Sequence, residues 1–261
     1  MNKIKYIVLF ITVILSCKEN LNSSKESYFE IPKLYNSRLF NNDSIKKNEF
    51  EFAKLTQSNP IFIGKFKFKD SIDINPKFKE YASSLSDENI EKTSFSGLEI
   101  FIDYETTVYY NWDGYFPDSD LVFAYYPAYL VNSTNSNKIL FGKDGHIFGI
   151  QEAIDKESFD FWKPIEARPF DFCGNGSWRI AIEPNEFGLI LMKKYKGDYT
   201  TKLRTRIKNG DNIIVSNDYY GKINKSQFKI ADSSSIKRRL INSDSTDNTF
   251  SLFYGAKIDK N

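Results

Sequence analysis

The sequence has 261 residues, of which 41 % are hydrophobic, 27 % charged and 16 % aromatic, and the aromatic side chains include 23 Phe and 16 Tyr. This aromatic content favours strands over helices, so the composition predicts an all-β or β-dominated fold. The 36 Lys and Arg residues almost balance the 34 Asp and Glu residues, which excludes the strong positive excess that a nucleic-acid-binding domain usually carries.

The first residues have the layout of a secretory signal. Lys3 and Lys5 precede an apolar run over residues 6–15, and Ser16 and Cys17 follow directly. The run is about ten residues long, whereas a helix needs ~20 residues to cross a bilayer, so an anchor made of protein is not expected. Removal of residues 1–16 would leave about 245 residues close to neutral charge, enough for one large or two small domains.

The segment Ile14-Leu15-Ser16-Cys17 resembles the lipobox of bacterial lipoproteins, in which an apolar residue and a small residue precede a cysteine that is acylated before cleavage. The resemblance implies that the mature chain begins at Cys17 and that this cysteine carries three acyl chains, such as palmitate. Two chains already suffice for stable anchoring, so the attachment would be effectively permanent. The lipid would make the membrane itself a partner of the protein.

The residues after the cysteine refine the expected location. Lys18-Glu19 is similar to the pattern that directs lipoproteins of the Bacteroidetes group to the cell surface, and Asn20 departs from it. We therefore expect an outer-membrane lipoprotein in the cell envelope, either periplasmic or surface-facing.

The next two segments are expected to differ in order. Residues 17–48 are rich in Ser, Asn, Lys and Glu, which is typical of a flexible tether. Residues 49–120 predict a smaller β-rich region, because residues 61–69, 98–104 and 107–110 have the patterns of strands. Asn75-Pro76 opens the one short helix that the pattern indicates, over residues 76–85.

Residues 121–230 predict an antiparallel immunoglobulin-like β-sandwich, although the Cys-Trp-Cys pattern of immunoglobulin domains is absent. Asp144-Gly145 and Asn209-Gly210 are typical of type I′ hairpin turns, and residues 187–192, apolar on both faces, indicate a central strand. The expected strands are residues 125–132, 138–142, 146–151, 178–183, 187–195, 199–208 and 212–216. Residues 231–261 read as a polar tail, with a possible edge strand over residues 250–254.

Residue types that support catalysis or metal binding are scarce. His146 is the only histidine, so multi-histidine zinc sites are excluded, and a residue beside a tight hairpin is usually structural. With Cys17 acylated, Cys173 has no disulfide partner, and we expect a buried apolar thiol, with a Cys173–His146 dyad as the alternative. Asp118-Ser119-Asp120 offers too few oxygen ligands for a calcium loop. We expect no metal or cofactor.

The aromatic loop over residues 109–120 is the expected ligand site. Its candidate ligand-binding residues are Trp112, Tyr115, Phe116, Asp118 and Asp120. Aromatic rings stack on the apolar faces of sugars, and carboxylates accept hydrogen bonds from sugar hydroxyls. The alternative is that the rings form an aromatic plug at one end of the sandwich.

A second candidate surface lies on the strand over residues 199–208, where basic side chains alternate with apolar or hydroxyl ones. Lys202, Arg204, Arg206 and Lys208 fall on one face, where they would grip an anionic glycan or a lipid phosphate. The alternative is a solvated face balanced by acidic residues of the neighbouring strand.

Together these patterns predict a lipid-anchored, non-enzymatic binding or scaffolding module of the cell envelope, with glycan or an envelope protein as its partner. The alternative is a carboxylate-dependent envelope hydrolase, in which Asp113 and Asp118, or Asp118 and Asp120, would converge across a cleft.

Overall fold

The structure is a computed structural model of the chain. It describes residues 28–36, 46–58, 60–74, 94–111, 121–157, 161–169, 176–241 and 251–258. Strands and bridges make up 55 % of these residues and helices 8 %, which confirms the predicted all-β class. Among the described residues, no helix is long and apolar enough to cross a membrane.

The larger sheet has nine strands in the part of the chain that the structure describes. In spatial order they are β14 (Ser177–Ile182), β9 (Lys138–Lys143), β10 (His146–Ile147), β4 (Ile61–Lys67), β15 (Glu186–Lys193), β8 (Leu121–Asn132) and β2 (Lys46–Asn48), and β6 (Glu99–Ile102) and β7 (Val108–Tyr110) also pair with β8. The β2–β8 pair is parallel and the other pairs are antiparallel. β15 lies between β4 and β8 and is buried on both faces, so the predicted central strand is confirmed.

The second sheet has five antiparallel strands. They are β12 (Phe161–Pro164), β11 (Gly149–Asp155), β16 (Tyr199–Asn209), β17 (Asn212–Val215) and β18 (Tyr219–Ile223), with β17 and β18 paired to different parts of β16. Two short parallel pairs complete the described strands: β1 (Lys33–Tyr35) with β5 (Ser71–Asp73), and β3 (Thr56–Gln57) with β13 (Glu166–Ala167).

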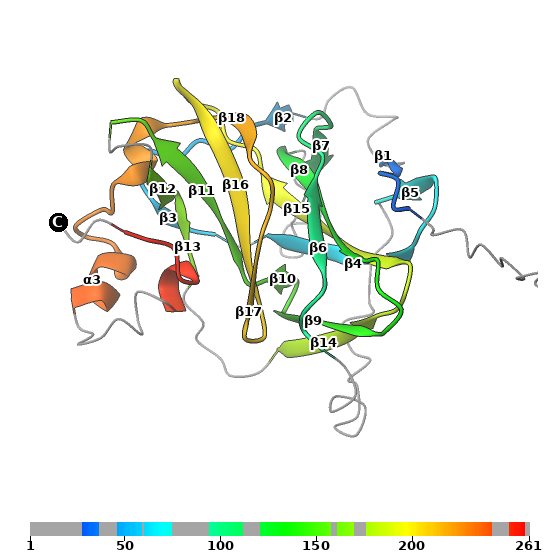
Figure 1. Cartoon of the computed structure of the whole chain (residues 1–261). Helices are drawn as coiled ribbons and strands as arrows, with labels where there is room; N and C mark the ends of the chain where they lie inside the picture. The colour runs from blue at the N-terminus through cyan, green and yellow to red at the C-terminus, as the bar shows by residue number, and fades with distance from the viewer. Residues whose placement is uncertain are drawn as a thin grey trace, which may run out of the picture.

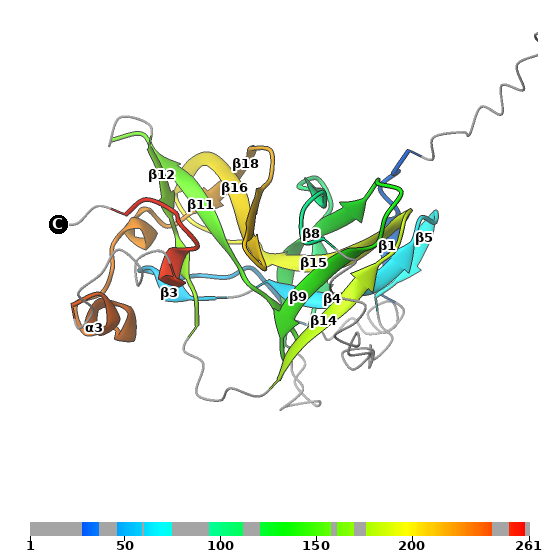
Figure 2. The same cartoon turned by 60° about the horizontal axis from the view of Figure 1, so that its bottom comes forward.

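The described residues form three layers. The nine-stranded and five-stranded sheets enclose the main core, to which β15, β16 and β18 contribute Leu189, Leu203 and Tyr219. A second core lies on the opposite face of β11, where Ile150 packs with Ile236 of helix α3 (Ser235–Ile241) and Phe253 of the C-terminal segment. Both views show α3 and this segment on the outer side of the five-stranded sheet (Figures 1 and 2).

The two predicted hairpins are present, but the predicted type I′ turns are wrong. Lys143 pairs with His146 and Asn209 pairs with Asn212, so the central residues are Asp144-Gly145 and Gly210-Asp211. In each turn only the first central residue has positive φ, 51° at Asp144 and 59° at Gly210, whereas a type I′ turn needs positive φ at both. Asn209 is therefore the last residue of its strand.

Three further expectations are corrected or refined by the strand order. The immunoglobulin-like arrangement is not confirmed, because one sheet alone holds nine strands, whereas immunoglobulin-type sandwiches have about seven in total. The single strand predicted over residues 146–151 is divided at Phe148 between β10 and β11, which belong to different sheets. Residues 251–253 are helical, so the edge strand expected over residues 250–254 is wrong there.

The structure also shows how the predicted segments are connected. Residues 33–35 and 46–48 of the expected tether form β1 and β2 and pair with other strands. Strands β4, β6 and β7, from the predicted region 49–120, share a sheet with β8 and β15, from residues 121–230. The helix expected over residues 76–85 lies outside the described residues.

Candidate functional site

A cleft of about 710 Å³ lies where β11, β12 and two helical segments come together. Its lining comes from the end of β11 and the turn after it, from β12, from the 3-10 helix η2 (Lys225–Phe228), from the residues that lead into α3 and from Lys237 of α3. Ile258 of the C-terminal segment and Leu55 complete it. The cleft therefore joins parts of the chain that are far apart in the sequence.

Local hydrogen bonds fix the two walls of the cleft. At the end of β11, the Asp155 carboxylate accepts from the Glu157 amide (3.1 Å) and so shapes the turn. At the start of η2, the Asn224 side chain accepts from the Ser226 amide (3.0 Å), and the Gln227 side chain accepts from the Asn224 amide (2.9 Å). This reciprocal capping box holds η2 against the chain that precedes it.

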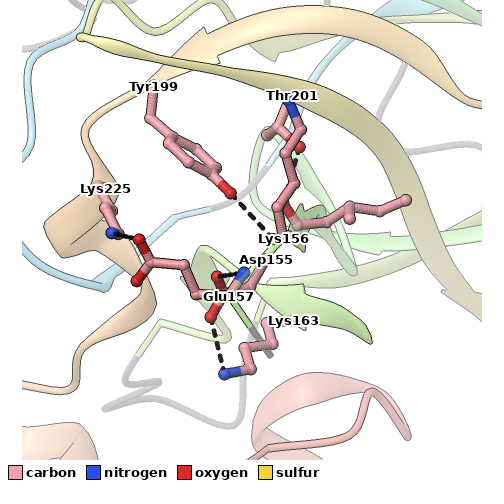
Figure 3. A network of polar contacts seen from close by, with 8 residues as sticks. Asp155, Lys156, Glu157, Lys163, Tyr199, Thr201 and Lys225 are labelled. Carbon is pink, nitrogen blue, oxygen red and sulfur yellow. Dashed lines mark hydrogen bonds and ion pairs between the residues drawn. The ribbon is translucent and has the colours of Figure 1, made fainter. Parts of the chain in front are cut away.

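Two ion pairs cross the lining of the cleft (Figure 3). The Lys163 ammonium lies 3.0 Å from Asp155 Oδ2, and the two side chains are only 11 % and 10 % exposed. The Lys225 ammonium pairs with Glu157 Oε1, and this hydrogen bond raises the pKa of Lys225 above its ordinary value. The pairs tie β12 to β11 and η2 to the turn after β11.

Tyr199 of β16 contacts the same wall, and Figure 3 shows its hydroxyl directed at Lys156. Its hydroxyl accepts a hydrogen bond from the Lys156 amide (2.9 Å), and its ring meets Phe228 edge-on at 5.8 Å between centroids. The Lys156 ammonium also donates to the Thr200 carbonyl (3.2 Å). These contacts attach the turn after β11 to β16, and they attach β16 to η2.

The lining has further charged side chains outside these two ion pairs. Lys229 and Lys237 line the cleft, and neither side chain has a hydrogen bond or ion pair with another described residue. Asp232 is the third carboxylate of the lining, beside four lysines. Since two lysines are paired with Asp155 and Glu157, the described lining keeps one ammonium group in excess.

A deeply buried carboxylate, Glu166, lies elsewhere, in the core near β11. Its Oε2 accepts from the Gln151 amide (2.8 Å), and its Oε1 accepts from the Gln151 side chain (3.1 Å) and from the Tyr195 hydroxyl. The Tyr219 hydroxyl donates to the Gln151 side-chain oxygen (3.1 Å). Burial, and then the charge of Glu166, raises the pKa of Tyr195 well above its ordinary value. The cluster joins β11, β13 and β18 and is structural.

The basic face of β16 is balanced by acidic residues. The Lys202 ammonium lies 2.6 Å from Asp218, and the Nε atoms of Arg204 and Arg206 lie 2.7 and 3.2 Å from the same oxygen of Glu152. Lys202 lowers the pKa of Asp218 through its hydrogen bond. At these three basic residues the structure therefore favours the alternative in which neighbouring acidic residues balance the charge, over a strand face that binds an anionic ligand.

Most of the predicted site residues lie outside the described residues, and their assignments stay predictions. These residues are Cys17, Trp112, Asp113, Tyr115, Phe116, Asp118, Asp120 and Cys173. His146 is half-buried in β10, where its backbone is paired with Lys143 of β9 and Ile61 of β4 in the sheet. Sequence reasoning missed the cleft. Asn224, followed by Gln227 three positions later, is the local signal that could have located the start of η2.

The fold and the cleft together define an all-β protein with a charged lateral cleft. Within the described ranges, no group of three or more His, Cys, Asp or Glu side chains is placed to hold a metal ion. No family model, curated protein or solved structure matches the chain.

Proposed function

We propose that this chain is a lipid-anchored protein of the bacterial cell envelope that binds a glycan in the cleft beside η2. The observation that carries the proposal is the cleft itself. Its walls are held by the nearly buried Lys163–Asp155 pair and by the capping hydrogen bonds of η2, while Lys229 and Lys237 line it without a partner among the described residues. Fixed walls with a few free polar groups suit ligand binding, because little conformational entropy is then lost on association.

The lipobox resemblance at residues 14–17 supports the membrane anchor. The position of the cleft is compatible with it, because α3 and the C-terminal segment lie at the end of the molecule opposite β1, the first described strand (Figures 1 and 2). The cleft would therefore lie on the side of the fold that faces away from the strand nearest in sequence to the proposed anchor.

The state of the carboxylates supports binding over catalysis. Asp155 and Glu157 each form an ion pair with a lysine. The Asp155 pair is nearly buried and keeps that carboxylate in one position, whereas a general acid must be able to hold and release a proton during the reaction. This arrangement suits the proposed non-enzymatic role.

A glycan array probed with the full chain in detergent micelles tests the proposal. Asp232 is exposed and lines the cleft, so Asp232→Trp should fill part of it and reduce the array signal at least about tenfold, a loss of ~1.4 kcal/mol. Ser233 is also exposed but does not line the cleft, so Ser233→Trp is the matched control and should leave the signal unchanged.

A third variant separates the cleft from the aromatic loop predicted from the sequence. If Trp112→Ala removes glycan binding and Asp232→Trp does not, the loop is the ligand site and the cleft is not. Chain-length analysis of the glycans after incubation adds one further outcome, because shortened products would favour the hydrolase alternative.

A further inference from the structure

We infer that the ligand of this cleft is an acidic sugar chain, whose carboxylate is bound by Lys229 and Lys237. The inference rests on the proposed function and adds the chemical class of the ligand. It follows from three properties of the lining: its uncompensated charge, its apolar side chains and its carboxylates.

The charge of the lining favours an anion. Two of the four lysines, Lys163 and Lys225, form ion pairs with Asp155 and Glu157, so each of these positive charges is balanced by a carboxylate of the lining. Lys229 and Lys237 come from different parts of the chain, the end of η2 and the body of α3, and both line the cleft. With Asp232 counted, the described lining still has one ammonium group in excess. A ligand carboxylate between Lys229 and Lys237 would gain two charge-assisted hydrogen bonds, which are about twice as strong as neutral ones.

The apolar side chains of the lining favour a compact ring over a fully hydrated ion. Pro164, Phe228, Ile230 and Ile258 line the same cleft as the lysines. The C–H faces of a sugar ring are apolar and pack on such side chains, whereas inorganic phosphate offers no surface of this kind. A long acyl chain would need a more uniformly apolar lining, but eight of the thirteen lining residues here are polar or charged.

The paired carboxylates complete the match to a sugar. Asp155 and Glu157 retain acceptor capacity beyond their ion pairs, because an ionised carboxylate has about four lone-pair sites. Sugar hydroxyls are donors that can use these sites. An acidic sugar therefore offers an anion for the lysines, apolar faces for Phe228 and Ile230, and hydroxyls for the carboxylates.

The test compares a galacturonic acid trisaccharide with the matching neutral galactose trisaccharide, by calorimetry on the full chain in detergent micelles. We expect the acidic sugar to bind at least about tenfold more tightly, and the difference to shrink as salt is raised. The double variant Lys229→Gln/Lys237→Gln should remove this preference and retain the melting temperature. Lys67→Gln/Lys222→Gln, which neutralises two exposed lysines away from the cleft, is the charge-matched control and should keep the preference.

Each contrary result has a distinct meaning. Equal binding of the two sugars, or binding of neither, would overturn the acidic ligand, while the glycan array would still decide the proposed function. A preference for the acidic sugar that survives in the Lys229→Gln/Lys237→Gln variant would show that other residues bind the carboxylate, and would overturn the inference.

Discussion

At Gly210, two independent restrictions act on a single residue. Its φ of 59° lies in the left-handed region, and a Cβ added there would lie 2.7 to 3.0 Å from ring atoms of Phe95. A β-branched side chain tolerates this backbone conformation poorly. We predict that Gly210→Val lowers the free energy of unfolding by about 1 to 3 kcal/mol, measured by urea denaturation.

The neighbouring residue provides the control for this prediction. Asp211 is the second central residue of the same turn, is exposed and does not have positive φ, so Asp211→Ala should change stability little. If both variants unfolded at the same urea concentration as the wild type, the turn would not restrict the fold in this way.

The proposed anchor also depends on one residue. Because lipid would be attached through the Cys17 thiol before cleavage, Cys17→Ala should accumulate as an unprocessed, mislocalised precursor that incorporates no labelled palmitate. Cys173→Ala removes the other cysteine of the chain and should be labelled like the wild type. Equal labelling of the Cys17→Ala variant and the wild type would rule out the anchor.

At the scale of elements, one side chain joins the hairpin of the smaller sheet to β9 of the larger one. The Asn209 side chain is fully buried; it accepts from the Phe141 amide (2.9 Å) and donates to the Ile139 carbonyl (2.7 Å), both in β9. The side chain thus supplies hydrogen bonds to two backbone groups on the side of β9 that no neighbouring strand covers at residues 139–141. Asn209→Ala should leave these buried groups unpaired and destabilise the protein by ~2 to 4 kcal/mol.

Thermal and urea unfolding measure this effect, with Asn212→Ala as the matched variant. Asn212 is the partner of Asn209 across the turn and is only half-buried, so its replacement should cost much less. Similar losses in the two variants would mean that the contact between the sheets contributes little.

The sequence predicts elements well where burial produces a local pattern. β15 and β16 were predicted closely, because the first is apolar on both faces and the second alternates strictly. The break at Phe148 was missed, because the apolar run continues through the point where the chain passes from one sheet to the other. Residues 251–253 form a helical turn, but three successive residues here, Leu252, Phe253 and Tyr254, are buried, so the sequence has no helical period that reveals it.

The cleft could not be predicted for a related reason. Its lysines, such as Lys163 and Lys237, are ordinary surface residues in the sequence and become neighbours only through the packing of β12, η2 and α3. Residues 231–241 were predicted to be a flexible tail, because their Ser, Asp and Lys content conceals the single buried side chain of α3, Ile236. The aromatic loop had a clear local pattern, but most of it lies outside the described residues.

At the scale of the whole molecule, buried tyrosines make stability depend on alkaline pH. Burial, and then the charge of Glu49, raises the pKa of Tyr126 to about 12, and burial also raises the pKa values of Tyr125, Tyr129, Tyr195 and Tyr219. Unfolded tyrosines ionise near pH ~10, so the folded state holds these protons more tightly. Their contribution to stability is complete below about pH 10 and is lost as pH rises through the folded pKa values.

Urea denaturation at about pH 9 and about pH 11 measures this dependence, and the midpoint should fall between the two. Burial lowers the pKa of Lys193, which has the opposite effect and increases stability as pH rises towards the ordinary lysine value. The five tyrosines should outweigh this single lysine above pH ~10. A midpoint that rises from pH 9 to pH 11 would contradict the packing described for these rings.

The central claim is that the cleft beside η2 is the ligand site. Hydrogen–deuterium exchange of the full chain in detergent, with and without the glycan that binds most strongly on the array, tests it most directly. We predict slower exchange of backbone amides in residues 161–163 and 225–232 when the glycan is bound, and no change in β4 and β15. Protection confined to residues 109–120, with residues 225–232 unchanged, would contradict the claim.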